Sequence, residues 1–129
     1  MNRKKLENKL DKLWREIGKE NAECEICKTL PESACIYSQL HAHHIIGRKR
    51  KITRWDLKNR IWLCPSHHTL GNLAVEFNLG GWFWGAEKDW MGAFRPEDKE
   101  YLQSKMQEPP KKWTIEELEG LILVLERQH

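Results

Sequence analysis

The sequence lacks a long apolar run. The longest strongly apolar stretch, residues 121–125, is far shorter than the roughly 20 residues that a helix needs to cross a bilayer. The first ten residues, MNRKKLENKL, carry charge but none of the apolar character that a secretion signal contains. We therefore expect a cytoplasmic protein with no membrane partner.

Cysteine is sparse, and its scarcity is informative. Four cysteines in a chain without a secretion signal favour thiolate metal ligands in a reducing compartment over disulfides. The sequence also contains no internal repeat and no low-complexity segment. At 129 residues, 40% hydrophobic and 32% charged, it suits one small globular domain, in which a structural metal adds appreciably to stability.

Four segments make up this single domain. Residues 1–21 carry an apolar stripe at helical spacing and are predicted to form an N-terminal helix. Residues 22–76 contain the candidate catalytic and metal-binding residues. Residues 77–95 are predicted to form a loop that mixes glycine with tryptophan and phenylalanine. For these rings we favour core packing or a subunit contact over stacking on unpaired bases. Residues 96–129 predict two C-terminal helices separated by a proline pair.

The order strand, loop, strand, helix is predicted inside the second segment. Residues 37–46 and 59–63 are predicted to form strands, because each contains β-branched or aromatic residues. Gly47 opens a long basic loop between them. Cys64 and Pro65 begin a helix, since proline suits the first helical position. The expected fold class is therefore α+β, a two-stranded hairpin plus a helix, flanked by the N- and C-terminal helices.

Two ligand pairs have the spacing of a zinc site. They are Cys24-x-x-Cys27 and Cys64-x-x-His67, three thiolates and one imidazole, which fill a tetrahedral site and leave no open position. We expect a structural Zn²⁺ that staples the domain, because two such pairs rarely coincide by chance. Cys35 is the competing fourth ligand, although it has no spaced partner and a buried thiol is the ordinary outcome for it.

Cations concentrate in one stretch, although the net charge is only +3. A single acid, Asp56, lies among seven cations: Arg48, Lys49, Arg50, Lys51, Arg54, Lys58 and Arg60. A basic loop beside a metal site suggests a phosphate-bearing partner. Any one of these side chains could simply be solvated, but seven like charges repel one another unless a polyanion offsets them.

Three stretches bring histidine, asparagine and cysteine together in one order. They are Ala42-His43-His44-Ile45-Ile46-Gly47, Trp55-Asp56-Leu57-Lys58-Asn59 and Leu63-Cys64-Pro65-Ser66-His67-His68. With His44, Asn59 and His68 in this order, the chain resembles the HNH endonuclease family, the ββα-metal nucleases. The likeness covers residues 24–72 and is closest to the small phage and prophage type with a zinc knuckle. It implies a ββα-metal core that cuts phosphodiester bonds with one divalent ion.

The sequence departs from the family's pattern at several positions. His43 stands where many members have aspartate, and His67 replaces the second cysteine of the usual closing pair. Both substitutes can ligate a metal. Asn72 stands where some members carry another histidine.

The resemblance assigns a role to each residue of the set. His44, neutral near physiological pH, is the expected general base. His43 and His68 are expected to hold a catalytic Mg²⁺ or Mn²⁺ against the scissile phosphate. Asn59 would brace the loop so that His44 keeps its orientation. The candidates to bind the DNA backbone are Arg48, Arg50, Lys51 and Arg54.

We therefore expect a metal-dependent DNA endonuclease or nickase. The alternative is a catalytically silent, zinc-stapled module for DNA binding or packaging, which gives no reason for His43, Asn59 and His68 to stand at nuclease spacing. RNA is a further candidate substrate. The C-terminal helices are the expected contact with a second copy of the chain, or with another phage protein in a bacterial host cell.

Overall fold

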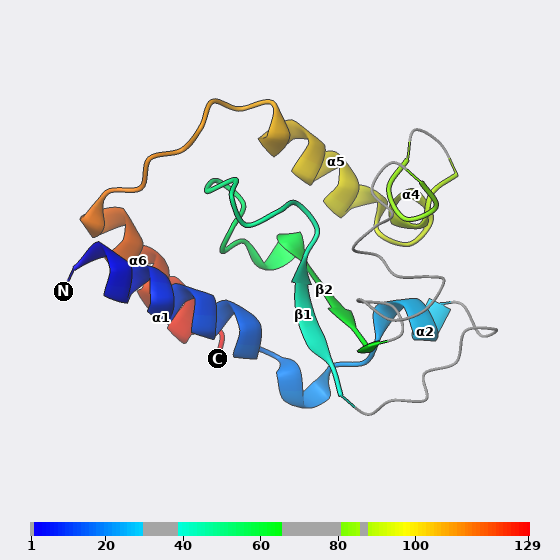
Figure 1. Ribbon diagram of the computed structural model, residues 1–129, viewed down its shortest axis with the longest axis horizontal. Helices are drawn as coiled ribbons and strands as arrows, with labels where there is room; N and C mark the ends of the chain where they lie inside the picture. Colours follow the sequence, from blue (N-terminus) through cyan, green and yellow to red (C-terminus); the bar gives the residue numbers. More distant parts are fainter. Residues whose placement is uncertain (1, 30–38, 66–80, 86–87) are drawn as a thin grey trace.

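The computed structural model describes residues 2–29, 39–65, 81–85 and 88–129 (Figure 1). In chain order its elements are α1 (Arg3–Glu16), η1 (Lys19–Asn21), α2 (Glu25–Thr29), β1 (His41–His44), η3 (Leu57–Asn59), β2 (Arg60–Leu63), α4 (Trp90–Phe94), α5 (Pro96–Met106) and α6 (Ile115–Glu126). A small hairpin among helices confirms the mixed fold class. The helix expected after Cys64 falls on residues outside the described part, so the ββα core stays a prediction. None of the helices in these ranges has the length and hydropathy of a bilayer span.

Helices α1 and α6 lie side by side and build one of two apolar clusters (Figure 1). Asn2 caps α1, because its side-chain oxygen accepts a hydrogen bond of 2.9 Å from the Lys5 backbone N–H. Thr114 and Glu117 form a reciprocal capping box that begins α6. Burying a large apolar side chain contributes roughly 2 kcal/mol. The side chains buried between these helices include Leu6, Leu10, Trp14, Leu118, Ile122 and Leu125.

Helix α1 ends at Glu16, before the expected end of the N-terminal helix at residue 21. The reason is Gly18, whose φ of 78° lies in the left-handed region that glycine adopts without steric cost. The chain then makes the short turn η1 and runs on to α2. This early stop brings Cys24 toward the hairpin instead of extending the helix past it.

Strands β1 and β2 pair antiparallel, with His41 opposite Leu63 and His44 opposite Arg60. The first strand is shorter than residues 37–46, the range expected for it, and residues 37 and 38 lie outside the described part. The second strand begins at Arg60, because Asn59 belongs to η3. Asp56 caps η3 by accepting a hydrogen bond of 2.9 Å from the Lys58 N–H, so it holds the turn that leads into β2.

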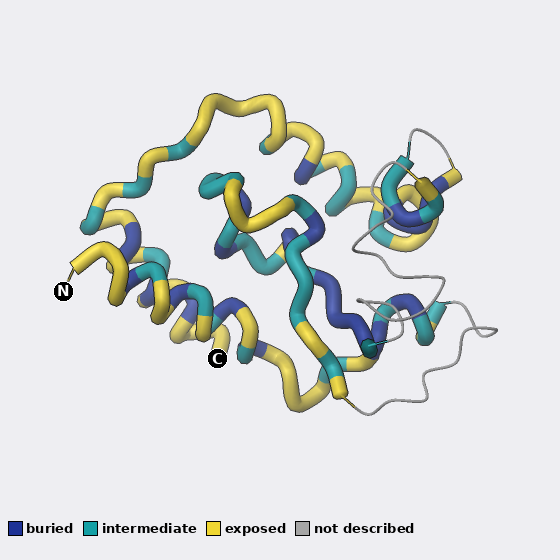
Figure 2. Tube along the Cα trace, viewed as in Figure 1, coloured by how far each residue is buried: buried dark blue, intermediate teal, exposed yellow. Residues whose placement is uncertain are grey.

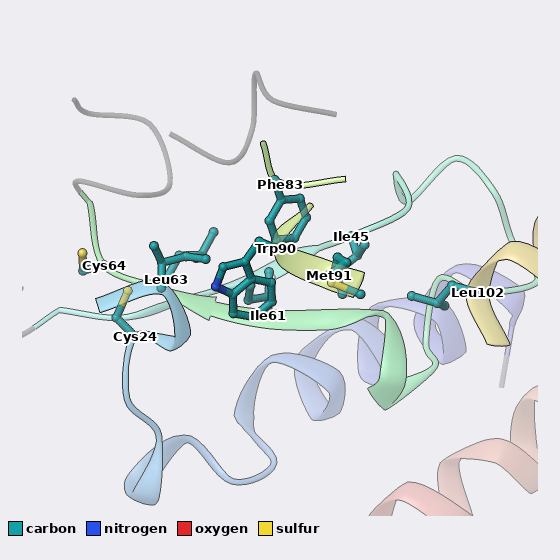
Figure 3. Close-up of a cluster of buried hydrophobic side chains, with 10 residues drawn as sticks. Cys24, Ile45, Ile61, Leu63, Cys64, Phe83, Trp90, Met91 and Leu102 are labelled. Atoms are coloured by element: carbon teal, nitrogen blue, oxygen red, sulfur yellow. The ribbon is translucent and has the colours of Figure 1, made fainter. Parts of the chain in front are cut away.

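The second apolar cluster surrounds the hairpin (Figure 3). Figure 2 shows that β2 is buried along most of its length. The stacked rings of Phe83 and Trp90, 5.6 Å between centroids, cover this strand together with Met91 and Leu102. Core packing of the glycine- and tryptophan-rich segment is thus confirmed for Phe83 and Trp90. Within the loop expected there, residues 90–94 form the short helix α4, capped by Asp89.

Candidate metal centre and catalytic hairpin

Three thiolates meet at one end of the hairpin. The Sγ atoms of Cys24, Cys27 and Cys64 all lie within 4.8 Å of one another, and Cys27 Sγ is 3.7 Å from Cys64 Sγ. A tetrahedral zinc with Zn–S bonds of about 2.3 Å places its sulfurs about 3.8 Å apart, so this spacing fits a zinc ion. Cys24 and Cys64 are buried in the apolar cluster (Figure 3), and Cys27 is half-buried. The three residues can therefore hold a metal, as the sequence predicts.

Local structure explains how two of these thiolates face the third. The Cys24 carbonyl accepts the Lys28 N–H at 3.0 Å, so Cys24 stands at the start of α2 and Cys27 lies one turn further on the same side. Cys64 follows the last residue of β2. The hairpin therefore carries Cys64 to the sulfurs that α2 presents.

Glu25 holds α2 against the second strand. Its carboxylate accepts a hydrogen bond of 2.9 Å from the Trp62 backbone N–H and lies 3.4 Å from the Arg95 guanidinium. Burial raises the pKa of Glu25, and the Trp62 hydrogen bond and the Arg95 charge offset this only in part. Because Glu25 stands between the two cysteines, its contact with β2 sets the distance from them to Cys64.

Arg95 ties the chain after α4 to the same region. Its guanidinium donates to the Arg60 carbonyl at 2.9 Å and to the Lys58 carbonyl at 3.0 Å, and it also pairs with Asp98. Nothing in the spacing of the ligand pairs pointed to Arg95 or Glu25.

The remaining expected ligands fall outside the described residues. These are His67 for the zinc, His68 for the catalytic ion, the competitor Cys35, and Asn72. The structure therefore presents three of the four expected zinc ligands and one of the two expected ligands of the catalytic ion, His43.

The two adjacent histidines of β1 face opposite sides of the hairpin, because side chains alternate along a strand. His43 pairs with Ile61 in the sheet and shares its face with Ile45, which is buried in the cluster around the hairpin. His44 lies on the other face, against α1. One histidine thus looks toward the cysteine half of the molecule and the other toward the N-terminal helix.

His44 is held on two sides. Its ring lies flat on the Trp14 indole, with 3.8 Å between centroids and 7° between planes, and its Nε2 is 2.9 Å from the Arg54 carbonyl oxygen. A carbonyl can only accept, so in the neutral ring Nε2 carries the proton and Nδ1 carries the lone pair. Burial lowers the pKa of His44, and the Arg54 carbonyl opposes that effect. The ring is therefore oriented and neutral near pH 7, with Nδ1 as its basic atom.

Asn59 joins the two ends of the basic loop. It is fully buried, and its Oδ1 accepts the Ile46 N–H at 2.6 Å. Its Nδ2 donates to the Ile46 carbonyl at 2.9 Å and to the Thr53 carbonyl at 3.0 Å. All three bonds go to backbone groups, so Asn59 braces the loop that supplies the Arg54 carbonyl to His44. Asn59 acts through position, and it has no spare polar atom exposed for a substrate.

Asp11 of α1 offsets part of the charge of the basic loop. Asp11 accepts from the Arg54 guanidinium at 2.8 and 3.2 Å and from the Trp55 indole at 2.8 Å. Burial alone would raise the pKa of Asp11, but the hydrogen bonds from Arg54 and Trp55 and the charges of Arg54 and Arg48 hold this pKa below its usual value. Intramolecular pairing therefore explains part of a cluster for which the sequence suggested a polyanion.

The four candidate backbone-binding cations differ in how available they are. The Arg54 side chain is only 11% exposed in its pair with Asp11, whereas Arg48, 3.3 Å from the same carboxylate, is 60% exposed. Lys51 pairs with Glu7 at 3.1 Å. Among the described residues, Arg50 has no ion pair within 4 Å. Arg48 and Arg50 are thus the better placed pair for phosphates, and Arg54 has a structural task.

Comparisons of the chain with protein-family models, curated proteins and solved structures find no match. The residues and their geometry are therefore the whole basis for a function.

Proposed function

We propose that this protein is a metal-dependent endonuclease or nickase that hydrolyses DNA phosphodiester bonds. The observation that supports it best is the restraint of His44, whose ring is stacked on Trp14 and tied through Nε2 to the Arg54 carbonyl. A histidine that merely fills space needs no such orientation. A general base does, because its basic nitrogen must meet a water molecule at a fixed angle.

His44 would take the proton of the attacking water at Nδ1. The Arg54 carbonyl accepts the Nε2 proton, so it also stabilises the positive charge that the ring gains in this step. Asn59 would keep that carbonyl in place by bracing the loop. Arg54 and Asn59 would then be positioning residues, and of the three only His44 would contact the reacting water.

A divalent ion on His43 and His68 would supply the positive charge that a more negative transition state requires. Imidazole ligands suit Mn²⁺ better than Mg²⁺, which prefers oxygen. Arg48 and Arg50, exposed or half-buried on the loop after β1, would hold the DNA backbone near this hairpin.

A plasmid-nicking assay on protein of known zinc content tests the proposal. His44→Ala should lower the nicking rate by at least about a hundredfold, since a general base contributes that much, while zinc content and DNA affinity stay nearly unchanged. His129→Ala is the matched control, because it removes an exposed histidine at the chain end. Nicking by His44→Ala at the rate of the unmodified protein would refute the assigned base.

The second candidate is a zinc-stapled DNA-binding or packaging module without activity. The cluster of three thiolates favours it, because such a cluster completed by a fourth ligand would be a closed site that stabilises a domain and performs no catalysis. An unmodified protein that binds DNA but cuts neither DNA nor RNA with Mg²⁺ or Mn²⁺ would select this module. Cutting of RNA alone would keep the enzyme and change its substrate.

A further inference from the structure

A groove lies between the end of the basic loop, α5, α6 and the connection at residues 107–114. It has a volume of about 580 Å³ and is distinct from the thiolate cluster and from His43 and His44. We call it the α5–α6 groove. Its lining includes three lysines and three aromatic rings, of which the Trp55 ring is buried: Lys58, Lys105, Lys111, Tyr101, Trp113 and Trp55.

Three lysines from three segments are held over the aromatic rings of this groove. The Nζ atoms of Lys58 and Lys105 lie 4.4 and 5.6 Å from the centre of the Tyr101 ring, and Lys111 Nζ lies 4.9 Å from that of Trp113. Contacts of this kind attract an ammonium group to a ring face without using up its N–H donors. The ammonium groups are therefore gathered at one place and remain able to bind an anion.

The cationic lining continues toward the basic loop. A second hollow of about 350 Å³ is lined by Lys49, Arg50, Lys51, Pro110 and Lys111. Lys111 lines both hollows, so they are neighbours. Together they carry six cations and only two acids, Asp56 and Glu108. Asp56 is already engaged, since it accepts from the Tyr101 hydroxyl and from the Lys58 N–H.

Carboxylates near these lysines are easily displaced. Lys105 lies 3.2 Å from Glu108 and Lys111 lies 2.7 Å from Glu117, and all four side chains are between 30% and 46% exposed. Exposed ion pairs contribute little to stability. A phosphate that arrives at the groove can therefore replace either carboxylate at small cost.

We propose that the α5–α6 groove binds a single DNA strand, with phosphates on Lys105 and Lys111 and the chain leading past Arg50 toward the hairpin. A volume of about 580 Å³ is that of a site for a small ligand, which corresponds to roughly two nucleotides, whereas a duplex would only touch the rim. A positively charged groove that also contains aromatic rings is typical of proteins that bind an unpaired strand. The identity of the anion as DNA rests on the proposed function, but the place of the site does not.

The test measures the anisotropy of a fluorescein-labelled single strand of about 12 nucleotides without added divalent ion. The variant is Lys105→Ala with Lys111→Ala, and the matched control with the same loss of charge is Lys4→Ala with Lys12→Ala, two exposed lysines of α1. The groove variant should bind the strand about tenfold more weakly. Its salt dependence should be flatter by about 1.4 in log–log slope, because each lost phosphate contact removes about 0.7. The control should retain both values.

Three results would overturn the inference. They are an unchanged affinity in the groove variant, an equal loss in the control variant, and an equal loss for a duplex of the same sequence. Displacement of the strand by polyglutamate of equal length at the same concentration would mean that the groove binds an acidic peptide and not DNA. The outcomes for the groove and for the proposed function can be told apart. If the protein never nicks DNA but the groove variant binds the strand more weakly, only the proposed function fails. If the protein nicks DNA but the groove variant binds the strand as well as before, only the groove site is refuted.

Discussion

The α1–α6 pair and the cysteine half of the molecule are stabilised in different ways. The pair consists of helices of 14 and 12 residues with capped N-termini and a buried leucine-rich seam. The cysteine half contains two strands of 4 residues and helices α2 and α4 of 5 residues each. Elements this short are marginal on their own. Both halves bury an apolar cluster, but the short elements of the cysteine half are also tied together by specific links among the thiolates, Glu25 and Arg95.

The candidate catalytic histidines lie where these halves meet. His44 stacks on Trp14 of the helical pair, while His43 faces the cluster around the hairpin. A change in either half can therefore shift His43 and His44 relative to one another. The following changes separate the contributions of the two halves, from the largest expected effect to the smallest.

Removal of a thiolate should have the largest effect. Cys64→Ser should lower the free energy of unfolding by on the order of 4 kcal/mol or more and abolish stoichiometric zinc, because metal binding is coupled to folding. Thermal unfolding and metal analysis of the purified protein measure the two effects. Cys35→Ser is the comparison. Zinc retained in Cys64→Ser and lost in Cys35→Ser would show that the ligand set is different.

Opening a cavity in the helical pair should have the next effect. Leu10 is fully buried between α1 and α6, and Leu10→Ala should cost about 3 kcal/mol in denaturant unfolding. Zinc content should stay at one per chain under native conditions, because none of the three cysteines that the structure describes lies in this cluster. Loss of zinc together with stability would mean that the two halves form one inseparable unit.

Asn59→Ala should have a smaller effect on stability. It leaves the Ile46 N–H and the Ile46 and Thr53 carbonyls without their side-chain partner, at a cost of about 2 kcal/mol. Nicking should fall through kcat more than through KM, since the His44 ring loses its fixed carbonyl. Asn8→Ala, at an exposed position of α1, is the control. Full activity in Asn59→Ala would show that the loop holds its shape without the brace.

The pair between Asp11 and Arg54 should give the smallest effect and a pH dependence. The pKa of Asp11 is lower in the folded protein than its usual value of 3.8, so the pair stabilises the fold above that pH. The stabilisation is lost as pH falls through the lower, folded pKa. Asp11→Asn should therefore cost about 1 kcal/mol at pH 6 and less at a pH well below 3.8. An equal cost at both pH values, by denaturant unfolding, would contradict this role for the Asp11 carboxylate.

Short-range patterns made part of this structure predictable. The pair Cys24 and Cys27 is set by one turn of helix, and a hairpin ending at Cys64 brings the third thiolate to it. The amphipathic stripe of α1 and the capping box of α6 are also local signals. The spacing of Cys24 and Cys27, the stripe and the capping box each depend on residues within a few positions of one another. Cys64 is 37 positions from Cys27 and reaches it only through the pairing of β1 with β2.

Contacts between distant segments were not predictable in the same way. The stack of Trp14 on His44 and the pairing of Asp11 with Arg54 join α1 to the hairpin and its loop. Neither has a spacing that the sequence reveals, because tertiary packing alone sets the distance. The expected end of the N-terminal helix was wrong for a local reason, the left-handed backbone of Gly18.

The central claim is that a zinc ion stabilises the cysteine half of the molecule. X-ray absorption at the zinc edge of the purified, unmodified protein tests this claim most directly. We expect one zinc per chain, three sulfur ligands at about 2.3 Å from Cys24, Cys27 and Cys64, and one nitrogen at about 2.0 Å from His67. Four sulfur ligands would mean that Cys35, and not His67, is the fourth ligand. Protein that folds fully with no bound zinc would contradict the account.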